Sequence, residues 1–401
     1  MMKNVLIVNC VFDPEPVVSA QIGKSLAESL YESGENVTVI APYPSRPMGF
    51  QFSDAPIKSH RIKSFVSKER LKCYNLPSFV YAKSGIIGRF RESISFGRAS
   101  FNFIIKSDLK YDIVYMNTWP IFGQLGVVLA CKRKKIPYVI HIMDIYPESI
   151  TKRLPGLFRI IANSLLMPVE KFILRNAKLI IAISNKMKTY LQESRNLNSE
   201  KIAVVYNWQD EKDFNVNLES CVNAKKVFMY LGNIGPVAGI PFLIECFSGI
   251  NAKLIVAGSG SYKEHCQKIA EKYPNTDIEF MDVPAGKVAQ VQSLADVMLL
   301  PIVKGSANTS IPSKLPAYMF SKKPVLVMAD ADSDSVITVQ NAKCGWTGEY
   351  GDADGLTNSI NKILEIEDKQ LQQMGLSGYY YARENFSKTT NLNKLKSELL
   401  N

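Results

Sequence analysis

Two strand-like segments in the second half of the chain each run into a loop that could hold a phosphate. Residues 227–231 are followed by Gly232-Asn233-Ile234-Gly235, and residues 297–301 by a polar loop that ends at Pro312-Ser313-Lys314. The proline is typical of a first helical turn. Backbone N–H groups at the carboxyl ends of parallel strands, helped by a lysine, can neutralise an anion. We expect them to bind the diphosphate of a nucleotide sugar.

Glycines and small polar residues dominate the candidates for this donor site. A Gly-x-Gly after residues 254–257 is the weakest of them, because an ordinary tight turn has the same pattern. The donor-binding candidates are Gly232, Asn233, Gly235, Gly258, Gly260, Asn308, Thr309, Ser310, Ser313 and Lys314.

Acids follow a strand-like segment in the first half of the chain. Asp144 and Glu148 come directly after residues 138–142. They are placed to hold sugar hydroxyls or to act as acid and base, although Glu148 could instead cap the next helix. His141, inside the segment, fits either a catalytic role or an ordinary core histidine. The catalytic candidates are therefore His141, Asp144 and Glu148.

A further acidic loop follows residues 5–8. Asp13-Pro14-Glu15-Pro16 is stiffened by its two prolines. Because the carboxyl ends of parallel strands meet at one edge of a sheet, Asp13, Glu15 and Pro16 are candidates for the acceptor side of a cleft. An ordinary turn is the alternative.

The elements that must position these residues alternate along both halves of the chain. Short apolar runs such as 37–41 and 179–183 are typical of parallel strands buried on both faces, and helical patterns separate them. The sequence therefore predicts an α/β protein with two doubly wound, Rossmann-like domains and a cleft between them. We place them at residues 1–206 and 207–384, with a C-terminal helix over about 385–401 packing back on the first.

Positive charge is concentrated in the first domain. The chain has a net charge of +11, and residues 58–106 hold 11 basic against 2 acidic residues. Within this block, residues 86–105 have a helical apolar pattern flanked by arginines, which suits an anionic membrane surface. A core helix with a solvated rim is the alternative. Nucleic acid is not an expected partner, because no nucleic-acid-binding module accompanies the charge.

Other classes of protein are disfavoured by what the sequence lacks. No run of eighteen uncharged apolar residues predicts a membrane-spanning helix, and the first residues resemble a strand rather than a signal peptide. The seven cysteines are scattered, which indicates a reducing cytoplasm. The three histidines are not at metal-ligand spacing, so we expect no metal and no cofactor.

Taken together, these motifs resemble those of the GT-B glycosyltransferases of family 4. The similarity is greatest to the branch that builds O-antigen, capsule and colanic acid, including fucosaminyl-type transferases. It rests on residues 144–149, Asn207-Trp208, residues 232–235 and Pro312-Ser313-Lys314-Leu315 with Pro324-Val325. The resemblance implies a UDP-sugar donor in the second domain, an acceptor in the first, and transfer with retention and without a metal.

The chain departs from the wider family where that family has charged donor ligands. Thr309 and Ala317 stand where two glutamates are usual, and Asn233 and Ala238 stand where an arginine and a lysine are usual. Val17-Val18 replaces a glycine-rich stretch after the first strand. Lys314 and the backbone at 232–235 would then carry more of the donor site, with consequences for activity or donor choice.

We expect a metal-independent hexosyl or N-acetylhexosaminyl transferase, peripheral on the cytoplasmic face of the plasma membrane. Its partners would be a nucleotide sugar, a lipid-linked glycan acceptor and, through residues 58–106, an anionic membrane surface. Two alternatives are a nucleotide-sugar epimerase or hydrolase on the same fold, and a non-catalytic nucleotide-sugar-binding homologue.

Overall fold

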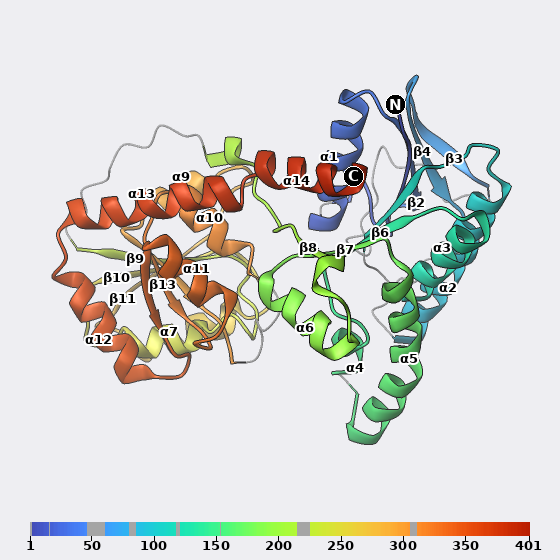
Figure 1. The fold of residues 1–401 in the computed structure, drawn as a ribbon. Coiled ribbons are helices and arrows are strands. Elements are labelled where there is room, and N and C mark those ends of the chain that lie inside the picture. Colours follow the sequence, from blue (N-terminus) through green and yellow to red (C-terminus); the bar gives the residue numbers. More distant parts are fainter. Residues whose placement is uncertain are drawn as a thin grey trace. The chain divides into compact units, whose positions relative to one another are not determined.

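The chain forms two compact units (Figure 1). A computed structural model describes residues 2–15, 17–45, 61–79, 86–117, 121–152, 154–214, 225–304 and 311–401. The first unit comprises Met1–Ile183, Leu191–Val205 and Leu392–Asn401. The second comprises Ser184–Tyr190 and Tyr206–Asn391.

The first unit is built on an eight-stranded sheet of order β3-β4-β2-β1-β5-β6-β7-β8. Its strands are β1 (Asn4–Val8), β2 (Asn36–Pro42), β3 (Lys63–Ser67), β4 (Leu71–Leu76), β5 (Ile113–Asn117), β6 (Tyr138–Ile142), β7 (Leu179–Ala182) and β8 (Ile202–Val204). All neighbours pair in parallel except β3 and β4. The chain moves outward from β1 in one direction and then restarts at β5 on the other side, so the topological switch point lies between β1 and β5.

Helices of the first unit connect these strands. They are α1 (Val18–Glu32), α2 (Ile86–Lys106), α3 (Ile121–Lys134), α4 (Glu148–Thr151), α5 (Gly156–Asn176) and α6 (Asn185–Arg195), with a 3₁₀ turn at η1 (Ser199–Lys201). The first residues of α6 belong to the second unit. There, Lys186 forms an ion pair with Asp332 at 2.6 Å, and Asn185 donates to the Tyr206 hydroxyl.

The second unit contains a six-stranded parallel sheet of order β11-β10-β9-β12-β13-β14. Its strands are β9 (Val227–Leu231), β10 (Lys253–Ala257), β11 (Asp277–Met281), β12 (Val297–Pro301), β13 (Val325–Met328) and β14 (Gly345–Gly348). Its helices are η2 (Glu211–Phe214), α7 (Ile240–Cys246), α8 (Lys263–Ala270), α9 (Val288–Ser293), α10 (Lys314–Phe320), α11 (Asp334–Ala342), α12 (Ala353–Leu364) and α13 (Asp368–Asn385). The switch point lies between β9 and β12.

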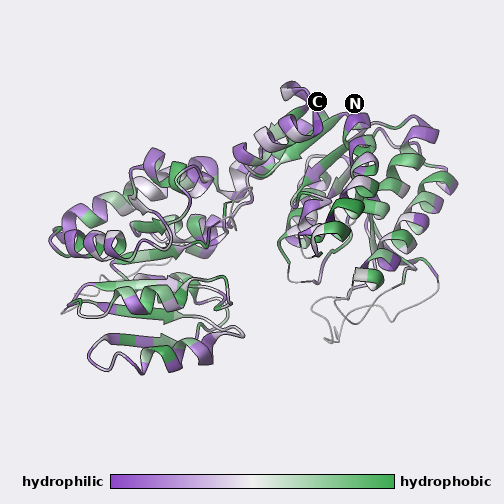
Figure 2. Ribbon diagram, turned by 90° about the horizontal axis from the view of Figure 1, so that it is seen from below, coloured by the Kyte–Doolittle hydropathy of each residue, from purple (hydrophilic) through white to green (hydrophobic). Residues whose placement is uncertain are grey.

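The apolar runs of the sequence become the central strands of both sheets. Every residue of β5, β6, β9 and β12 is buried, and Figure 2 colours strands inside both sheets mostly green, for hydrophobic residues. Strands covered by helices on both faces need apolar residues at every position, which explains the lack of alternation. Two α/β domains with parallel sheets are therefore confirmed, as the fold class predicted.

The structure differs from the prediction in one region. The basic block contributes the antiparallel pair β3 and β4 to the sheet edge as well as the predicted helix. In the C-terminal tail, α13 ends at Asn385 and α14 (Lys388–Leu400) starts after Ser387. In the last part of α14, Lys396 donates to Ser33 of the first unit at 2.9 Å. Among the described residues, no helix is long and apolar enough to cross a bilayer.

Candidate functional site

In the second unit, two glycines, Gly232 and Gly258, bring two loops into contact at the carboxyl edge of the sheet. Gly232 donates to Ala257 at 3.0 Å, and Ile234 donates to Ser259 at 2.8 Å. Gly258 has a φ of +128°, and a Cβ there would lie 2.1 Å from the Gly232 carbonyl oxygen. No side chain fits into this space. The loops after β9 and β10 therefore form one surface made of backbone.

Two tyrosines hold the end of β9 in place. The buried Tyr318 hydroxyl accepts from the Leu231 N–H at 3.0 Å and donates to the Leu231 carbonyl at 2.8 Å. Tyr230 donates from its hydroxyl to the Asn233 carbonyl at 2.7 Å. These bonds fix the backbone that leads into Gly232.

Lys314 lies over this backbone surface. A Cβ on Gly232 would meet the lysine Cε at 2.1 Å, and the ammonium lies 5.0 Å from the centroid of the Tyr230 ring. The half-buried Lys314 forms no ion pair among the described residues. Desolvation consequently lowers its pKa. An anion at this position would restore the favourable environment that the lysine lacks.

The remaining donor-side candidates surround this lysine in part. Asn233 is exposed, and Gly235 is buried next to the Asn233 side chain. Ser313 is the N-cap residue of α10, and its carbonyl oxygen accepts a hydrogen bond from the Gln209 side chain at 3.0 Å. The helix begins at Lys314, two residues after Pro312, which was expected to open it. Asn308, Thr309 and Ser310 fall outside the described residues.

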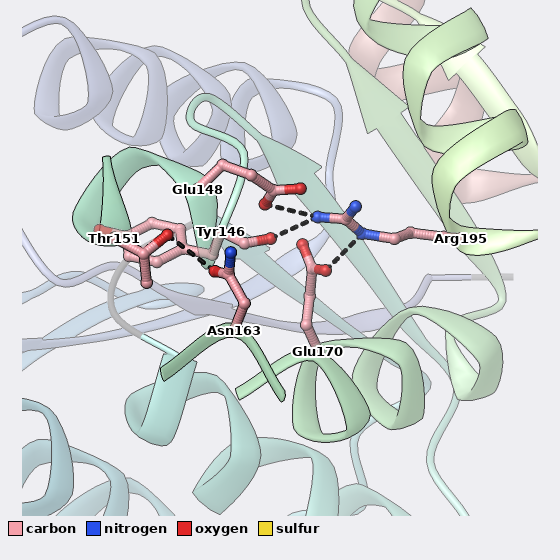
Figure 3. A network of polar contacts seen from close by, with 6 residues as sticks. All are labelled: Tyr146, Glu148, Thr151, Asn163, Glu170 and Arg195. Atoms are coloured by element: carbon pink, nitrogen blue, oxygen red, sulfur yellow. Dashed lines mark hydrogen bonds and ion pairs between the residues drawn. The ribbon is translucent and has the colours of Figure 1, made fainter. Parts of the chain in front are cut away.

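In the first unit, a buried arginine holds the loop that contains Asp144 and Glu148 (Figure 3). The guanidinium of Arg195 is 2.7 Å from Glu148, 2.6 Å from Glu170 and 2.7 Å from the Tyr146 carbonyl oxygen. The end of α6, the middle of α5 and the loop after β6 are thereby joined. Arg195 is 1% exposed, so these contacts are shielded from water.

The Arg195 network changes the interpretation of Glu148. Its carboxylate pairs with Arg195, and Glu148 is the first residue of α4 but does not cap it, because the N-cap residue is Pro147 and no side chain makes a capping bond. Glu170, the second partner, is 4% exposed, and burial raises its pKa to about 7 despite the adjacent guanidinium. Asp144 is an exposed residue whose pKa is raised by desolvation of the carboxyl. It is the acid of this loop that remains available to a ligand.

The acidic loop after β1 divides its two acids between different roles. Glu15 is 3% exposed, and its carboxylate accepts from the N–H groups of Phe12 and Ser45 at 3.1 and 2.9 Å. It therefore ties the loop after β1 to the loop after β2 and does not face solvent as expected for an acceptor-side residue. Asp13 is exposed and pairs with Lys24 of α1 at 2.9 Å. Pro16 lies outside the described residues.

His141 belongs to a buried polar row at the first switch point. The register pairs Asn117 of β5 with His141 of β6, and Asn9 follows β1 next to them. His141 Nδ1 is 2.8 Å from the Tyr115 hydroxyl, and full burial lowers its pKa to about 3. The side chains of Asn9 and Asn117 both donate to the Ser19 carbonyl. A neutral histidine with no exposed surface fits the structural interpretation better than the catalytic one.

Several residues of these networks were missed at the level of sequence. Asn9 and Asn117 had a usable signal, because Asn9 directly follows the apolar strand β1 and Asn117 is the last residue of the apolar strand β5. Arg195 and Glu170 had none, since an arginine near a helix end and a glutamate within a helix are ordinary in sequence. Their pairing appears only when α5 and α6 meet.

The basic block contributes an open groove between the end of β4 and α2. The groove has a volume of about 530 Å³ and is lined by Pro77, Phe79, Arg91, Ile94, Ser95, Arg98, Ala99 and Asn102. Arg91 stacks on the Phe79 ring at 4.4 Å from its centroid. Helix α2 buries only part of the predicted apolar face, because Ile87 and Ile94 are 78% and 55% exposed whereas Phe90, Phe101 and Ile105 are half-buried. It packs instead through residues such as Ser93, which accepts from Gly123 of α3.

Two family models match adjoining parts of the chain. Residues 24–212 match the model described as Glycosyltransferase Family 4, and residues 211–379 match Glycosyl transferases group 1. A curated relative, the probable glycosyltransferase WbjE of Pseudomonas aeruginosa, is 23% identical over 297 residues, which span 71% of this chain and 73% of the relative.

Solved structures resemble the chain over nearly its whole length. HepE from Anabaena, crystallised with UDP, superposes with a TM-score of 0.68 at 15% identity and 99% coverage of both chains. WaaG, a glycosyltransferase involved in lipopolysaccharide biosynthesis, superposes with a TM-score of 0.66 at 14% identity, covering 98% of this chain and 99% of WaaG. The fold is GT-B, and together with the two family matches it identifies the protein as a glycosyltransferase.

Proposed function

We propose that the protein is a retaining glycosyltransferase that moves a hexosyl or N-acetylhexosaminyl group from a UDP-sugar to a lipid-diphosphate-linked glycan in cell-surface polysaccharide biosynthesis. The observation that carries the proposal is Lys314, a half-buried lysine without an ion pair among the described residues, lying over Gly232 at a switch point. HepE, of similar fold, was crystallised with UDP. The resemblance to O-antigen and capsule transferases supplies the acceptor class and retention.

The chemical demand of the reaction is stabilisation of the leaving group. As the sugar departs, negative charge grows on the nucleoside diphosphate. The Lys314 ammonium and the N–H groups near Gly232 would meet that charge without a divalent ion. Asp144, exposed at the carboxyl edge of the first sheet, would orient a sugar or acceptor hydroxyl.

The groove on α2 supports an anionic acceptor. Arg91 and Arg98 line it together with the apolar side chains of Pro77, Phe79 and Ile94. Two guanidinium groups next to an apolar wall suit a diphosphate attached to a lipid. The protein would work on the cytoplasmic face of the plasma membrane, with residues 58–106 facing anionic lipid.

The test is sugar transfer by purified protein to a lipid-linked acceptor, with UDP-, GDP- and dTDP-sugars compared as donors. We expect Lys314→Ala to lower the transfer rate by roughly 10²- to 10³-fold, as for loss of one donor to a developing oxyanion. Lys322→Ala is the matched control, because Lys322 also lies 5.0 Å from a tyrosine ring centroid but on the outside of the unit. It should keep wild-type activity.

Four outcomes would contradict parts of the proposal. Undiminished transfer by Lys314→Ala would remove the role assigned to this lysine, and loss of transfer after chelation of divalent cations would contradict metal independence. Turnover of the sugar nucleotide without any acceptor would favour an epimerase or hydrolase. Binding of UDP without turnover of any donor would indicate a non-catalytic homologue.

A further inference from the structure

The first half of α5 exposes a set of large apolar side chains. These are Leu157, Phe158, Ile160, Ile161 and Leu165, which are 69%, 66%, 61%, 49% and 69% exposed. Figure 1 shows this end of α5 projecting away from the sheet of the first unit. Single exposed apolar residues are common on protein surfaces, but a contiguous group on one helix indicates an interaction site.

The second half of the same helix is ordinary. Leu166, Ile173 and Leu174 are buried against the unit, and Glu170 pairs with Arg195. Pro168 lies close to the change between the two halves. The core therefore explains the apolar residues after 165 but leaves those at 157–165 without a partner among the described residues.

The charges around the exposed half favour an anionic partner. Lys152, Arg153 and Arg159 lie in or just before it, and no acidic residue occurs between Glu148 and Glu170. Lys152 and Arg159 are exposed. An apolar helix surface with basic residues and no acids is typical of a helix that lies in the interface of an anionic bilayer.

We propose that residues 156–165 of α5 insert into the surface of an anionic membrane. The inference deepens the proposed function and rests on it only for the identity of the acceptor. Thr151, the last residue of the short helix α4 that follows the Asp144 loop, donates to Asn163 at 2.7 Å. Insertion of this half of α5 would therefore hold the Asp144 loop at the lipid surface, where a lipid-linked acceptor presents its sugar.

The experiment is flotation of the full chain with vesicles of phosphatidylcholine, with and without phosphatidylglycerol. We expect the wild type to bind the anionic vesicles, and Phe158→Ser with Leu165→Ser to weaken binding by about tenfold or more, because two buried apolar side chains are lost. Lys152→Gln with Arg159→Gln should weaken binding to anionic vesicles only. Ile337→Ser with Tyr380→Ser is the control, since both residues are exposed apolar side chains of the second unit.

Each other outcome is decisive. Equal flotation of wild type and the α5 variant would overturn the inference, provided that both unfold at the same temperature. A wild-type dimer that the α5 variant abolishes in lipid-free solution would assign this surface to a second copy of the chain and also overturn it. If no acceptor is glycosylated but flotation still depends on α5, the proposed function fails and the membrane inference stands.

Discussion

The two sheets differ in the polar groups at their switch points. Between β9 and β12 of the second sheet, these groups are backbone amides and one lysine. Between β1 and β5 of the first sheet, they are buried side chains. Lys314 has no anionic partner among the described residues. By contrast, Asn9, Asn117 and His141 are buried, and each bonds within its own unit. The same topological position is thus lined by backbone amides and a lysine in one unit and by buried polar side chains in the other.

The difference shows which kind of polar residue is free to act on a substrate. The acids near the first switch point are largely occupied, because Glu15 binds two backbone N–H groups and Glu148 binds Arg195. They fix loops so that Asp144 keeps its place. In the second unit backbone bonds and Tyr318 fix the loop, and Lys314 has no ionic partner among the described residues. We therefore expect substitutions in the first unit to act mainly on stability.

The largest effect is expected at Arg195. Replacement by methionine removes the guanidinium that pairs with both the buried Glu170 and the half-buried Glu148, which costs about 3–5 kcal/mol of unfolding free energy. Urea unfolding followed by circular dichroism measures it. Arg133→Met, at an exposed position near the end of α3, is the control and should change stability by less than about 0.5 kcal/mol.

A second variant distinguishes two causes of the lost stability, the missing countercharge and the missing packing of the arginine side chain. Arg195→Met combined with Glu170→Gln removes one of the stranded carboxylates and should recover part of the loss. If the double variant is no more stable than Arg195→Met alone, the arginine stabilises the loop through its shape and its bond to the Tyr146 carbonyl, and the charge argument fails.

A smaller effect is expected in the second unit, at Gly258. Alanine there meets the Gly232 carbonyl oxygen and must adopt a φ of +128°, so we expect a loss of about 2–4 kcal/mol and weaker binding of UDP. Gly249→Ala is the matched control, because it has a φ of +78° with no atom within 4 Å of the added Cβ. Calorimetric titration with UDP measures the binding.

The control distinguishes two causes. If both alanine variants lose the same stability and neither changes UDP binding, backbone strain alone accounts for Gly258. The close contact between the loops after β9 and β10 would then have no part in the donor site. Weakened binding in Gly258→Ala alone would connect the backbone surface to the nucleotide.

The sequence allowed the fold and the glycine loops to be predicted because both depend on local information. Non-alternating apolar runs specify parallel strands, and glycines mark backbone that must approach closely. The group that a carboxylate binds in the folded protein depends instead on a partner far away in the sequence. Arg195 lies 47 residues from Glu148, and Ser45 lies 30 residues from Glu15, so neither pairing had a signal in the sequence.

The same limit explains the helices. The apolar periodicity of α2 identified a helix but not which side would meet α3, because Ser93, a small polar residue, lies on the packed face. In α5 the apolar pattern runs through both halves, and nothing local separates residues 157–165 from the buried residues that follow. Burial is a property of the neighbours that each segment finds in the folded unit.

The smallest expected effect is a pH dependence of stability that arises from Glu170. Burial raises its pKa from an ordinary 4.5 to about 7 in the folded protein. Such a carboxyl binds its proton more tightly when folded, so its contribution to stability is complete below about pH 4.5 and is lost as the pH rises through about 7. Between about pH 5 and about pH 8 we expect the wild type to lose on the order of 2 kcal/mol more than Glu170→Gln.

The unfolding free energies of both proteins are measured across this pH range. Glu193→Gln, on the neighbouring helix α6, is the control, and its unfolding free energy should change with pH as that of the wild type does. Parallel curves for wild type and Glu170→Gln would mean that Arg195 keeps Glu170 ionised throughout. The contrast between the units would then be sharper, because the first would hold a permanent buried ion pair where the second leaves Lys314 without one. A steeper wild-type curve would instead show that the cost of burying an ionised Glu170 exceeds the stabilisation from its pairing with Arg195.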